Sequence, residues 1–467
     1  MGFSSPASCS TNSTSSDVKM KAPRILIAAA LTLTALAATT VVAQTEASSA
    51  AAVSMTTISA PSPSDNSADP AVQPVKPAPH HYGPVSFRHD GLWFSTEDGS
   101  THLQVHGYVQ ADDRMFSANS KGEELDTFLF RRMRPLFEGA LFDNVDFRFM
   151  PDFGQNNPQV QEAYLELKTL PFAKFRVGKF KEPIGLEVLQ SDRNLKFPER
   201  SMASDLVPLR YIGAQLSGSI LKNSISYAGG YFDGSSDGSN GVFTQWAQGN
   251  EGVGRIFLQP FAATGVNAVH QFGLGVAGSS GSQHGTIAGL KTVGQTTFFQ
   301  YSSNVVADGQ HHRIAPQAYY YAGPFGLMGE YALSSQAVLN KGVIGKLTNQ
   351  AWQAQGSIVL TGEKNSYGAI RPRNSYEPNR GFRHFGAVEL AGRFAQLAID
   401  GRAFSGFAKS TTAAQQAKEV GIGVNWYLNQ YVKLVTDYEH TNFRMASTKV
   451  TPLHDENVLI SMIQLEF

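Results

Sequence analysis

Three arginines interrupt an otherwise apolar and aromatic segment, "FLFRRMRPLF" (128–137), at positions Arg131, Arg132 and Arg134. Charged side chains are rarely buried without partners, so such a segment must face water or opposite charge on at least one side. A guanidinium is planar, stays charged and donates two hydrogen bonds at once to an oxyanion. The residue types and their spacing therefore indicate anion-binding chemistry on one face of a strand.

Alternation along an extended strand separates the three arginines into two faces. Arg132 and Arg134 share one face, and Arg131 shares the other with Met133. The face of Met133 continues through apolar residues, so we assign it to lipid and assign Arg132 and Arg134 to water. Arg131 is the exception on that face, because an arginine at the lipid midplane costs about 2–4 kcal/mol. A register break or bulge near Pro135 would exchange the two faces.

Four further basic residues extend this pattern. Arg148 and Arg176 face the same aqueous interior by the alternation of their own segments, and Lys179 and Lys181 follow them. Rings of Arg and Lys select anions in pores. A second interpretation stays open, because residues 131–210 contain 13 basic and 11 acidic residues. In that interpretation the basic groups only pair with neighbouring carboxylates.

The elements that must position these side chains are strands. Period-2 alternation dominates from residue 91 onward, as in "YVKLVTDYEH" (431–440), and no apolar run of 18 residues follows the N-terminal region. A further strand at 296–303 would raise the number of strands to eighteen, and 362–382 is long for a turn. The sixteen predicted strands are 102–116, 126–141, 144–153, 159–169, 173–181, 208–221, 223–232, 251–262, 268–278, 312–322, 325–334, 350–361, 383–398, 416–428, 430–442 and 457–467.

The connections between these strands alternate between short and long. Tight turns at 142–144, 322–326 and 428–430 are flanked by aromatic residues, whereas connections such as 182–207 and 279–311 are long and polar or rich in Gly and Ser. The flanking aromatics are Phe142, Phe147, Tyr319, Tyr320, Tyr321, Phe325, Trp426, Tyr427 and Tyr431. Short turns at one rim and long loops at the other are typical of an outer-membrane barrel, with rings at the membrane interface. We therefore predict an all-β fold, a transmembrane antiparallel β-barrel of sixteen strands. A secreted, soluble β-sandwich that binds carbohydrate is the alternative fold.

The N-terminal region carries an export signal. Lys21 and Arg24 precede a short apolar stretch (25–38), and "VVA" (41–43) offers small residues for cleavage. We predict a secretory signal region at 1–43, with translation starting at Met1 or Met20. A disordered Ala/Ser/Pro-rich linker is predicted at 44–90 and the barrel at 91–467. The single cysteine, Cys9, precedes the cleavage point, so the exported chain would contain no disulfide.

The C-terminus gives further support for a barrel. The last segment, "NVLISMIQLEF", ends on Phe467, which shares a face with other apolar residues. A lipid-facing terminal aromatic suits the closing strand of a barrel, whereas the ends of soluble domains usually fray. We predict that Phe467 is an assembly signal for the barrel-assembly machinery.

Several of these segments together resemble the phosphate-selective porin O and P family. They are "RRMRPLFEGALFDNVDFRFMPDFG", "VQEAYLELK", "FRVGKFKEPIGLE", "DRNLKFPERS", "YYYAGPFGLMGEY" and "VNWYLNQYVKLVTDYEHTNF", within 100–467. The resemblance implies a trimeric outer-membrane porin with sixteen strands and an anion-attracting pore for small solutes such as phosphate or polyphosphate. In such a trimer we expect Arg131 near a trimer contact or a membrane rim. It also implies that the loop after the fifth strand, about 182–207, folds into the lumen and narrows it, with Lys179 and Lys181 at its base.

Other functional classes find less support in the sequence. Lys plus Arg and Asp plus Glu balance at 38 each, which gives no sign of a nucleic-acid partner. An outer-membrane barrel enzyme would need a Ser, His and acid set. "GSSDG" (234–238) matches the G-x-S-x-G pattern but lacks the helix that must follow it. The histidine doublets 80–81 and 311–312 lack metal-ligand spacing, so we predict no enzyme activity, no metal site and no cofactor.

Overall fold

The computed structural model describes residues 84–117, 126–170, 172–234, 236–241, 249–264, 266, 269–447 and 453–467. The predicted signal region and most of the predicted linker lie outside these residues. Within the described residues, no helix is long and apolar enough to cross a membrane.

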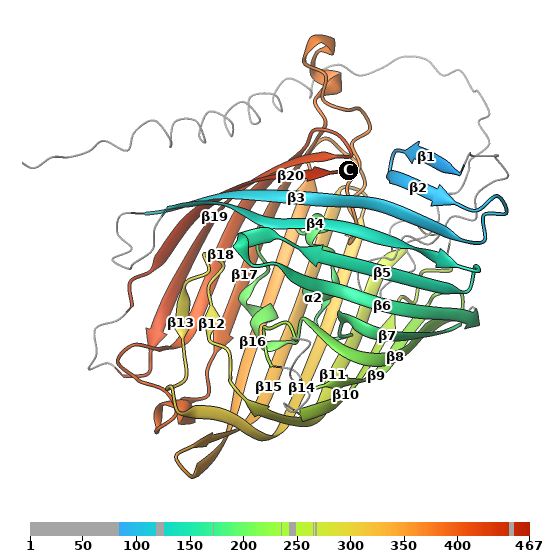
Figure 1. The fold of residues 1–467 in the computed structure, drawn as a ribbon. Helices are drawn as coiled ribbons and strands as arrows, with labels where there is room; N and C mark the ends of the chain where they lie inside the picture. The colour runs from blue at the N-terminus through green and yellow to red at the C-terminus, as the bar shows by residue number, and fades with distance from the viewer. Residues whose placement is uncertain are drawn as a thin grey trace, which may run out of the picture. The chain divides into compact units, whose positions relative to one another are not determined.

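In the described part of the chain, sixteen antiparallel strands form one closed sheet (Figure 1). Consecutive strands of this sheet pair with each other, and the last strand returns to pair with the first. The strands are β3 (His102–Phe116), β4 (Thr127–Leu141), β5 (Val145–Asp152), β6 (Gln159–Leu170), β7 (Ala173–Lys181), β8 (Arg210–Ile220), β9 (Ile225–Asp233), β10 (Gly249–Leu258), β11 (Gln271–Gly285), β14 (Val305–Ala322), β15 (Phe325–Asn340), β16 (Val343–Val359), β17 (Ala387–Ala398), β18 (Ala414–Tyr427), β19 (Val432–Met445) and β20 (Glu456–Glu466).

Each predicted strand corresponds to one of these sixteen, so the barrel prediction is confirmed. The candidate extra strand at 296–303 contributes only β13 (Thr297–Phe299). That strand pairs with β12 (Leu290–Lys291) in a separate two-stranded sheet and adds nothing to the barrel.

The two faces of the closed sheet have opposite chemistry. On β6, Leu165 and Leu167 are exposed on the outer face, while Glu162 and Glu166 are buried inside the barrel. A sandwich would bury the apolar face against a second sheet, whereas a membrane barrel exposes it to lipid. Exposed apolar side chains of other strands include Leu216, Ile256, Ile314, Leu327, Leu390, Ile422 and Ile463.

The edge of β3 that closes the barrel is shared by two partners. β20 pairs with residues 108–116, and the main chain of Phe467 exchanges hydrogen bonds of 2.8 and 3.0 Å with Gly107. Below that point, β2 (Gly91–Ser95) pairs with residues 102–105. β2 in turn pairs with β1 (Val85–Arg88), so these four residues form a strand within the region predicted as linker.

The connection between β7 and β8, residues 182–209, forms the inward loop. It contains α2 (Leu186–Leu189) and the 3₁₀ helices η2 (Asp192–Asn194) and η3 (Met202–Leu206), and nearly all of its residues are buried. Figure 1 shows α2 enclosed by the strands. The prediction that the loop after the fifth barrel strand folds into the lumen is confirmed.

Apolar side chains of the inward loop pack on small residues of the opposite wall. Val188 and Leu206 belong to one hydrophobic cluster with Ala277, Ala315 and Ala332, which lie on β11, β14 and β15. The small inward-facing residues on β11, β14 and β15 leave room for the inward loop, which therefore extends across the lumen and forms a partition inside the barrel.

A second connection also enters the barrel, between β16 and β17 (residues 360–386). Its Tyr367 donates a hydrogen bond to the carbonyl of Leu186 and stacks on Tyr319, with ring centroids 5.5 Å apart. The unusual length of this predicted turn thus has a structural explanation.

Some aromatic residues near the short turns do not lie at the membrane interface. Phe142 and Phe325 are exposed as expected, but Tyr319, Tyr321 and Tyr427 are buried inside the barrel. The interface prediction is wrong for these three tyrosines, because they pack on the inward-folded connections or bond to interior carboxylates.

Candidate functional site

A bulge in β4 determines the directions of the side chains of Arg131, Arg132 and Arg134. Gln110 on β3 pairs with Arg132 and Ala111 pairs with Phe130, so Arg131 has no pairing partner. A bulge exchanges the faces of the residues before and after it. Phe130 is therefore exposed, while Arg131 and Arg132 both turn inward. The expectation that Arg131 lies at a trimer contact or rim is wrong, and the register break occurs at Arg131 itself rather than near Pro135.

The inward loop supplies the counter-charges for this strand. Glu199 accepts hydrogen bonds from Arg131 at 3.0 Å, from Arg132 at 3.2 Å and from Arg114 at 2.6 Å. Burial alone would raise the pKa of the Glu199 carboxyl, but the charges of Arg131, Arg132 and Arg114 outweigh it and hold that pKa well below its usual range. Glu199 is thus ionised at neutral pH and holds the loop to β3 and β4.

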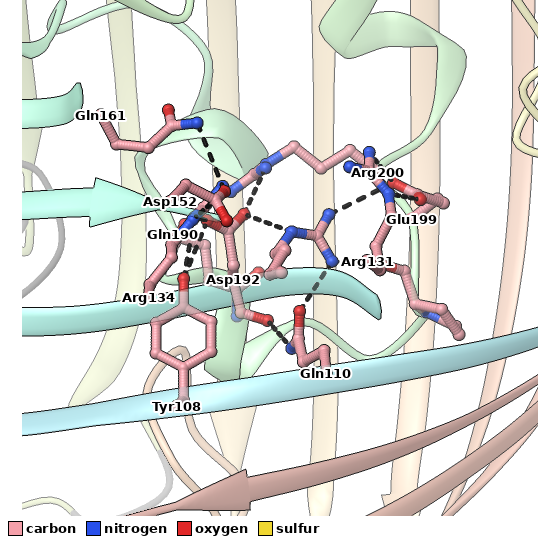
Figure 2. Close-up of polar contacts among 12 residues, drawn as sticks. Tyr108, Gln110, Arg131, Arg134, Asp152, Gln161, Gln190, Asp192, Glu199 and Arg200 are labelled. Carbon is pink, nitrogen blue, oxygen red and sulfur yellow. Dashed lines mark hydrogen bonds and ion pairs between the residues drawn. The ribbon is translucent and has the colours of Figure 1, made fainter. Parts of the chain in front are cut away.

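A second loop carboxylate, Asp192, is surrounded by four guanidinium groups. Arg200 lies 2.5 Å from its oxygens, Arg210 lies 3.7 Å away and Arg132 lies 3.9 Å away, while Arg134 forms a hydrogen bond to it. Figure 2 shows Arg134 and Arg200 directed toward Asp192, with Tyr108 next to them. Burial opposes ionisation, but the four positive charges lower the pKa of Asp192 far below its usual range.

The remaining predicted arginines pair with carboxylates of the barrel wall. Arg148 donates to Glu138 at 2.7 Å and to Glu162 at 3.3 Å. Arg176 lies 2.6 Å from Glu166 on the neighbouring strand. These pairs match the interpretation that lumen charges neutralise one another, which the sequence left open.

The two predicted lysines bond to main-chain carbonyls of inward segments. Lys181 donates to the carbonyl of Gln190 at 2.9 Å, and Lys179 donates to the carbonyl of Gly241. Both side chains are buried at the start of the inward loop. Lys181 therefore helps to hold the loop, a role that the sequence did not indicate.

The wall formed by β17–β19, which β20 alone separates from β3, carries an acidic group that the sequence analysis did not identify. Arg393 on β17 pairs with Glu419 at 2.5 Å and Glu439 at 2.7 Å, and it donates to the main-chain carbonyl of Glu199 at 2.8 Å. Gly421 on β18 lies opposite Arg393 on β17 and Glu439 on β19, and a β-carbon at this position would overlap the Glu439 carboxylate. The sequence did carry a signal for this group, because alternation along β17–β19 places Arg393, Glu419 and Glu439 on the inward, polar face of the sheet.

Two more contacts fix the inward loop from β15 and β17. Glu330 accepts hydrogen bonds from the main-chain N–H groups of Leu186 and Glu187 at the start of α2. Lys196 lies 2.9 Å from Glu389 on β17. The loop is therefore tied to both walls of the barrel by charged groups.

The described residues also bring a serine, a histidine and an aspartate together. His311 and Ser334 are hydrogen-bonded through Nε2 at 2.8 Å, and the Asp237 carboxylate lies 3.5 Å from the same nitrogen. Proton relay in a catalytic triad needs the acid on the other ring nitrogen, Nδ1. Asp237 instead pairs with Arg313 at 2.6 Å, so we interpret this group as structural.

No group of three or more His, Cys, Asp and Glu residues within the described ranges has a geometry suited to a metal ion. The charged interior described above is therefore the candidate site, a basic wall on β3–β8 and an acidic group on β17–β19 with the inward loop between them.

Comparison with known structures supports the fold. The barrel resembles the outer-membrane channel DcaP of Acinetobacter baumannii, with a TM-score of 0.52 and 10% identity over 81% of this chain and all of that chain. It also resembles the trimer form of OmpT from Vibrio cholerae (TM-score 0.51, 12% identity, 79% of this chain and 100% of that chain). The anion-selective porin from Comamonas acidovorans is similar as well (TM-score 0.50, 11% identity, 79% and 100%).

Sequence comparison is more specific. Porin O of Pseudomonas aeruginosa is 22% identical over 384 residues, which cover 74% of this chain and 84% of that protein. The family described as phosphate-selective porin O and P matches residues 103–467, which include all sixteen barrel strands except His102, the first residue of β3. The chain therefore belongs to the phosphate-selective porin O and P family.

Proposed function

We propose that this outer-membrane porin forms a water-filled channel that prefers small anions, with phosphate and polyphosphate as candidate solutes. The lipid bilayer surrounds its apolar outer face, and no catalytic step is required. The residues proposed to attract anions are Arg132, Arg134, Arg148, Arg176, Lys179 and Lys181.

The observation that carries this proposal is the density of guanidinium groups inside the wall from β3 to β8. Although carboxylates pair with them, Nε of Arg114 and Nη2 of Arg210 are buried and have no hydrogen-bond acceptor. Arginine forks bind oxyanions through paired donors, so we propose that the positive potential of these guanidinium groups draws small anions into the lumen. The acidic group around Arg393 lies on β17–β19, outside the wall from β3 to β8, so we propose the basic wall as the path for anions.

Assembly and export form part of the same proposal. OmpT of V. cholerae has been solved in a trimer form, and we propose a homotrimer for this chain as well. We further propose that the signal region is cleaved after Ala43 and that the barrel-assembly machinery inserts the exported chain. N-terminal sequencing of protein from the outer membrane would give a mature start at Gln44, and a chain that retains 25–38 would contradict cleavage.

Ion selectivity tests the channel proposal directly. In planar bilayers with a salt gradient, we expect the reversal potential to show anion preference. The preference should weaken as the Debye length shortens from about 10 Å at 0.1 M to about 3 Å at 1 M salt. Lys179→Glu should shift the reversal potential toward cations. Lys179 is the better choice than Lys181, because Lys181 holds the inward loop.

Lys418→Glu is the matched control, because Lys418 lies on β18 between the inward-facing Ala417 and Glu419 and so points outward. It makes the same change of charge and should leave the reversal potential unchanged. A wild-type channel that prefers cations would remove the anion claim while leaving the porin assignment in place.

A further inference from the structure

Asp192 lies where an oxyanion would bind. Its carboxylate is almost fully buried and is surrounded by guanidinium groups from β4, β8 and the inward loop itself: Arg132, Arg134, Arg210 and Arg200. The hydroxyl of Tyr108 also donates to it, at 3.4 Å. Four arginines and a hydroxyl around one monovalent anion are more donors than a carboxylate requires.

The carboxylate fills this site incompletely. Nη2 of Arg210 is buried, makes no hydrogen bond and lies 3.7 Å from Oδ2 of Asp192, whereas Arg200 lies 2.5 Å from Oδ1. A carboxylate is flat and has two oxygens, whereas a tetrahedral oxyanion such as phosphate offers oxygens in three or more directions and up to two or three charges. The ring of donors is therefore better matched to a tetrahedral anion than to the side chain that occupies it.

We propose that Asp192 is an internal occupant of an oxyanion site and that a multiply charged oxyanion of the phosphate class competes with it. This inference rests on the proposed anion channel and concerns its regulation. When the anion takes the place of the carboxylate, Asp192 leaves the arginines and η2 moves away from β4, so the solute itself loosens the partition in the lumen.

Apart from the ion pairs of Asp192, η2 is held mainly by neutral hydrogen bonds to its main-chain carbonyls. Gln110 donates to the carbonyl of Asp192 at 3.2 Å, Gln464 donates to that of Arg193 at 3.3 Å and Gln190 donates to that of Asn194 at 3.3 Å. The side chain of Arg193 lies 3.5 Å from the partly exposed Glu466. The stronger attachments of the loop, at Glu199 and at α2, lie on either side of η2. Release of Asp192 therefore moves a short segment while the rest of the loop stays in place.

The test measures the binding of inorganic phosphate to the folded, detergent-solubilised porin by titration calorimetry, and to the channel by block of chloride current in planar bilayers. Asp192→Asn keeps the shape of the side chain and removes its charge. We expect phosphate to bind about tenfold more tightly to this variant than to wild type, because the competing charge-assisted bonds are lost. Asp205→Asn is the control, since Asp205 lies on the same loop and bonds to the main chain of Lys291; it should bind phosphate like wild type.

Two outcomes would overturn the proposal. One is phosphate affinity in Asp192→Asn that is no higher than in wild type. The other outcome concerns a second variant, which is needed if heat-modifiable migration on gels shows that Asp192→Asn does not fold. Arg200→Gln in the wild-type background should weaken phosphate binding several-fold. Unchanged phosphate binding in Arg200→Gln would contradict the site. Calorimetry does not depend on ion current, so a cation-preferring channel would refute the proposed function separately from this inference.

Discussion

Arg131 donates hydrogen bonds from two of its guanidinium nitrogens to the carboxylate of Glu199, which lies 68 positions further along the chain. The bulge that leaves Arg131 unpaired in β4 is what brings its side chain inside, so the irregularity of the strand and the position of the loop depend on each other. The arginine-rich strand faces the carboxylates of the inward loop.

Glu199→Gln should lower the free energy of unfolding by about 3–5 kcal/mol, because it leaves the buried guanidinium groups of Arg114 and Arg132 and the partly buried one of Arg131 without their shared counter-charge. Thermal or denaturant unfolding in detergent would measure this. The double variant Arg131→Met/Glu199→Gln should lose less than the sum of the single variants. Glu377→Gln, at an exposed pair with Arg380, should have little effect. Strict additivity would show that Arg131 and Glu199 do not interact.

In wild type, the raised pKa of Asp205 should make the protein less stable as the pH rises from about 4 to about 7, and Asp205→Asn should abolish this pH dependence. Burial raises the pKa of Asp205 to about 7, with Glu419 and Asp237 adding to the rise and Lys291 opposing it. Because the pKa is higher in the folded state, this carboxyl stabilises the protein at low pH and the contribution is lost as pH rises through 7. Unfolding temperatures measured at pH 5 and pH 8 should therefore differ less in Asp205→Asn than in wild type. An equal difference in both proteins would contradict the assignment.

Tyr367→Ala should enlarge the channel, because this side chain links the 360–386 connection to the inward loop through Leu186 and stacks on Tyr319. Single-channel conductance and the size limit in liposome swelling should both increase, and Tyr367→Phe, which keeps the ring, should change them less. Tyr376 lies on the same connection but packs on Trp426, which lies on the outer face of β18, so Tyr376→Ala is the control. Equal conductance in Tyr367→Ala and wild type would place the narrow part of the channel elsewhere.

Deletion of Phe467 should reduce the amount of assembled barrel while leaving the conductance of the channels that do form unchanged. The deletion removes two main-chain hydrogen bonds to Gly107 and an aromatic ring that is 55% exposed on the outer face. Heat-modifiable protein in outer-membrane fractions measures assembly. Phe142→Ala, at another exposed aromatic, should assemble normally. Wild-type levels of the truncated barrel would refute the assembly role.

The strands could be predicted because their signal is local. Alternation of apolar and polar residues within each segment predicted all sixteen strands, and this signal needs no knowledge of which strands are neighbours. The inward path of 182–207 had no such signal in its own residues, since only the resemblance to the porin family implied it. The same alternation correctly turned Arg148 and Arg176 inward.

What could not be predicted depends on partners distant in the chain. The direction of Arg131 follows from its pairing with β3, and alternation within β4 alone gives the wrong face. Arg393 meets Glu419 and Glu439 only after three strands are aligned. Aromatic residues beside short turns have no local signal that distinguishes the membrane interface from an interior filled by a second connection, which is why Tyr319 was misplaced.

The division of the β3 edge between β20 and β2 has a consequence for how the barrel closes. A closing strand can in principle slide along its partner by two residues and keep its apolar side outward. Here residues 102–105 of β3 are already paired with β2, so β20 cannot slide further in that direction without displacing the N-terminal hairpin. The pairing of β2 with β3 therefore favours one register between β20 and β3, and the register of the closed sheet determines the tilt of the strands and the width of the barrel. The N-terminal hairpin would then help to set the diameter of the pore.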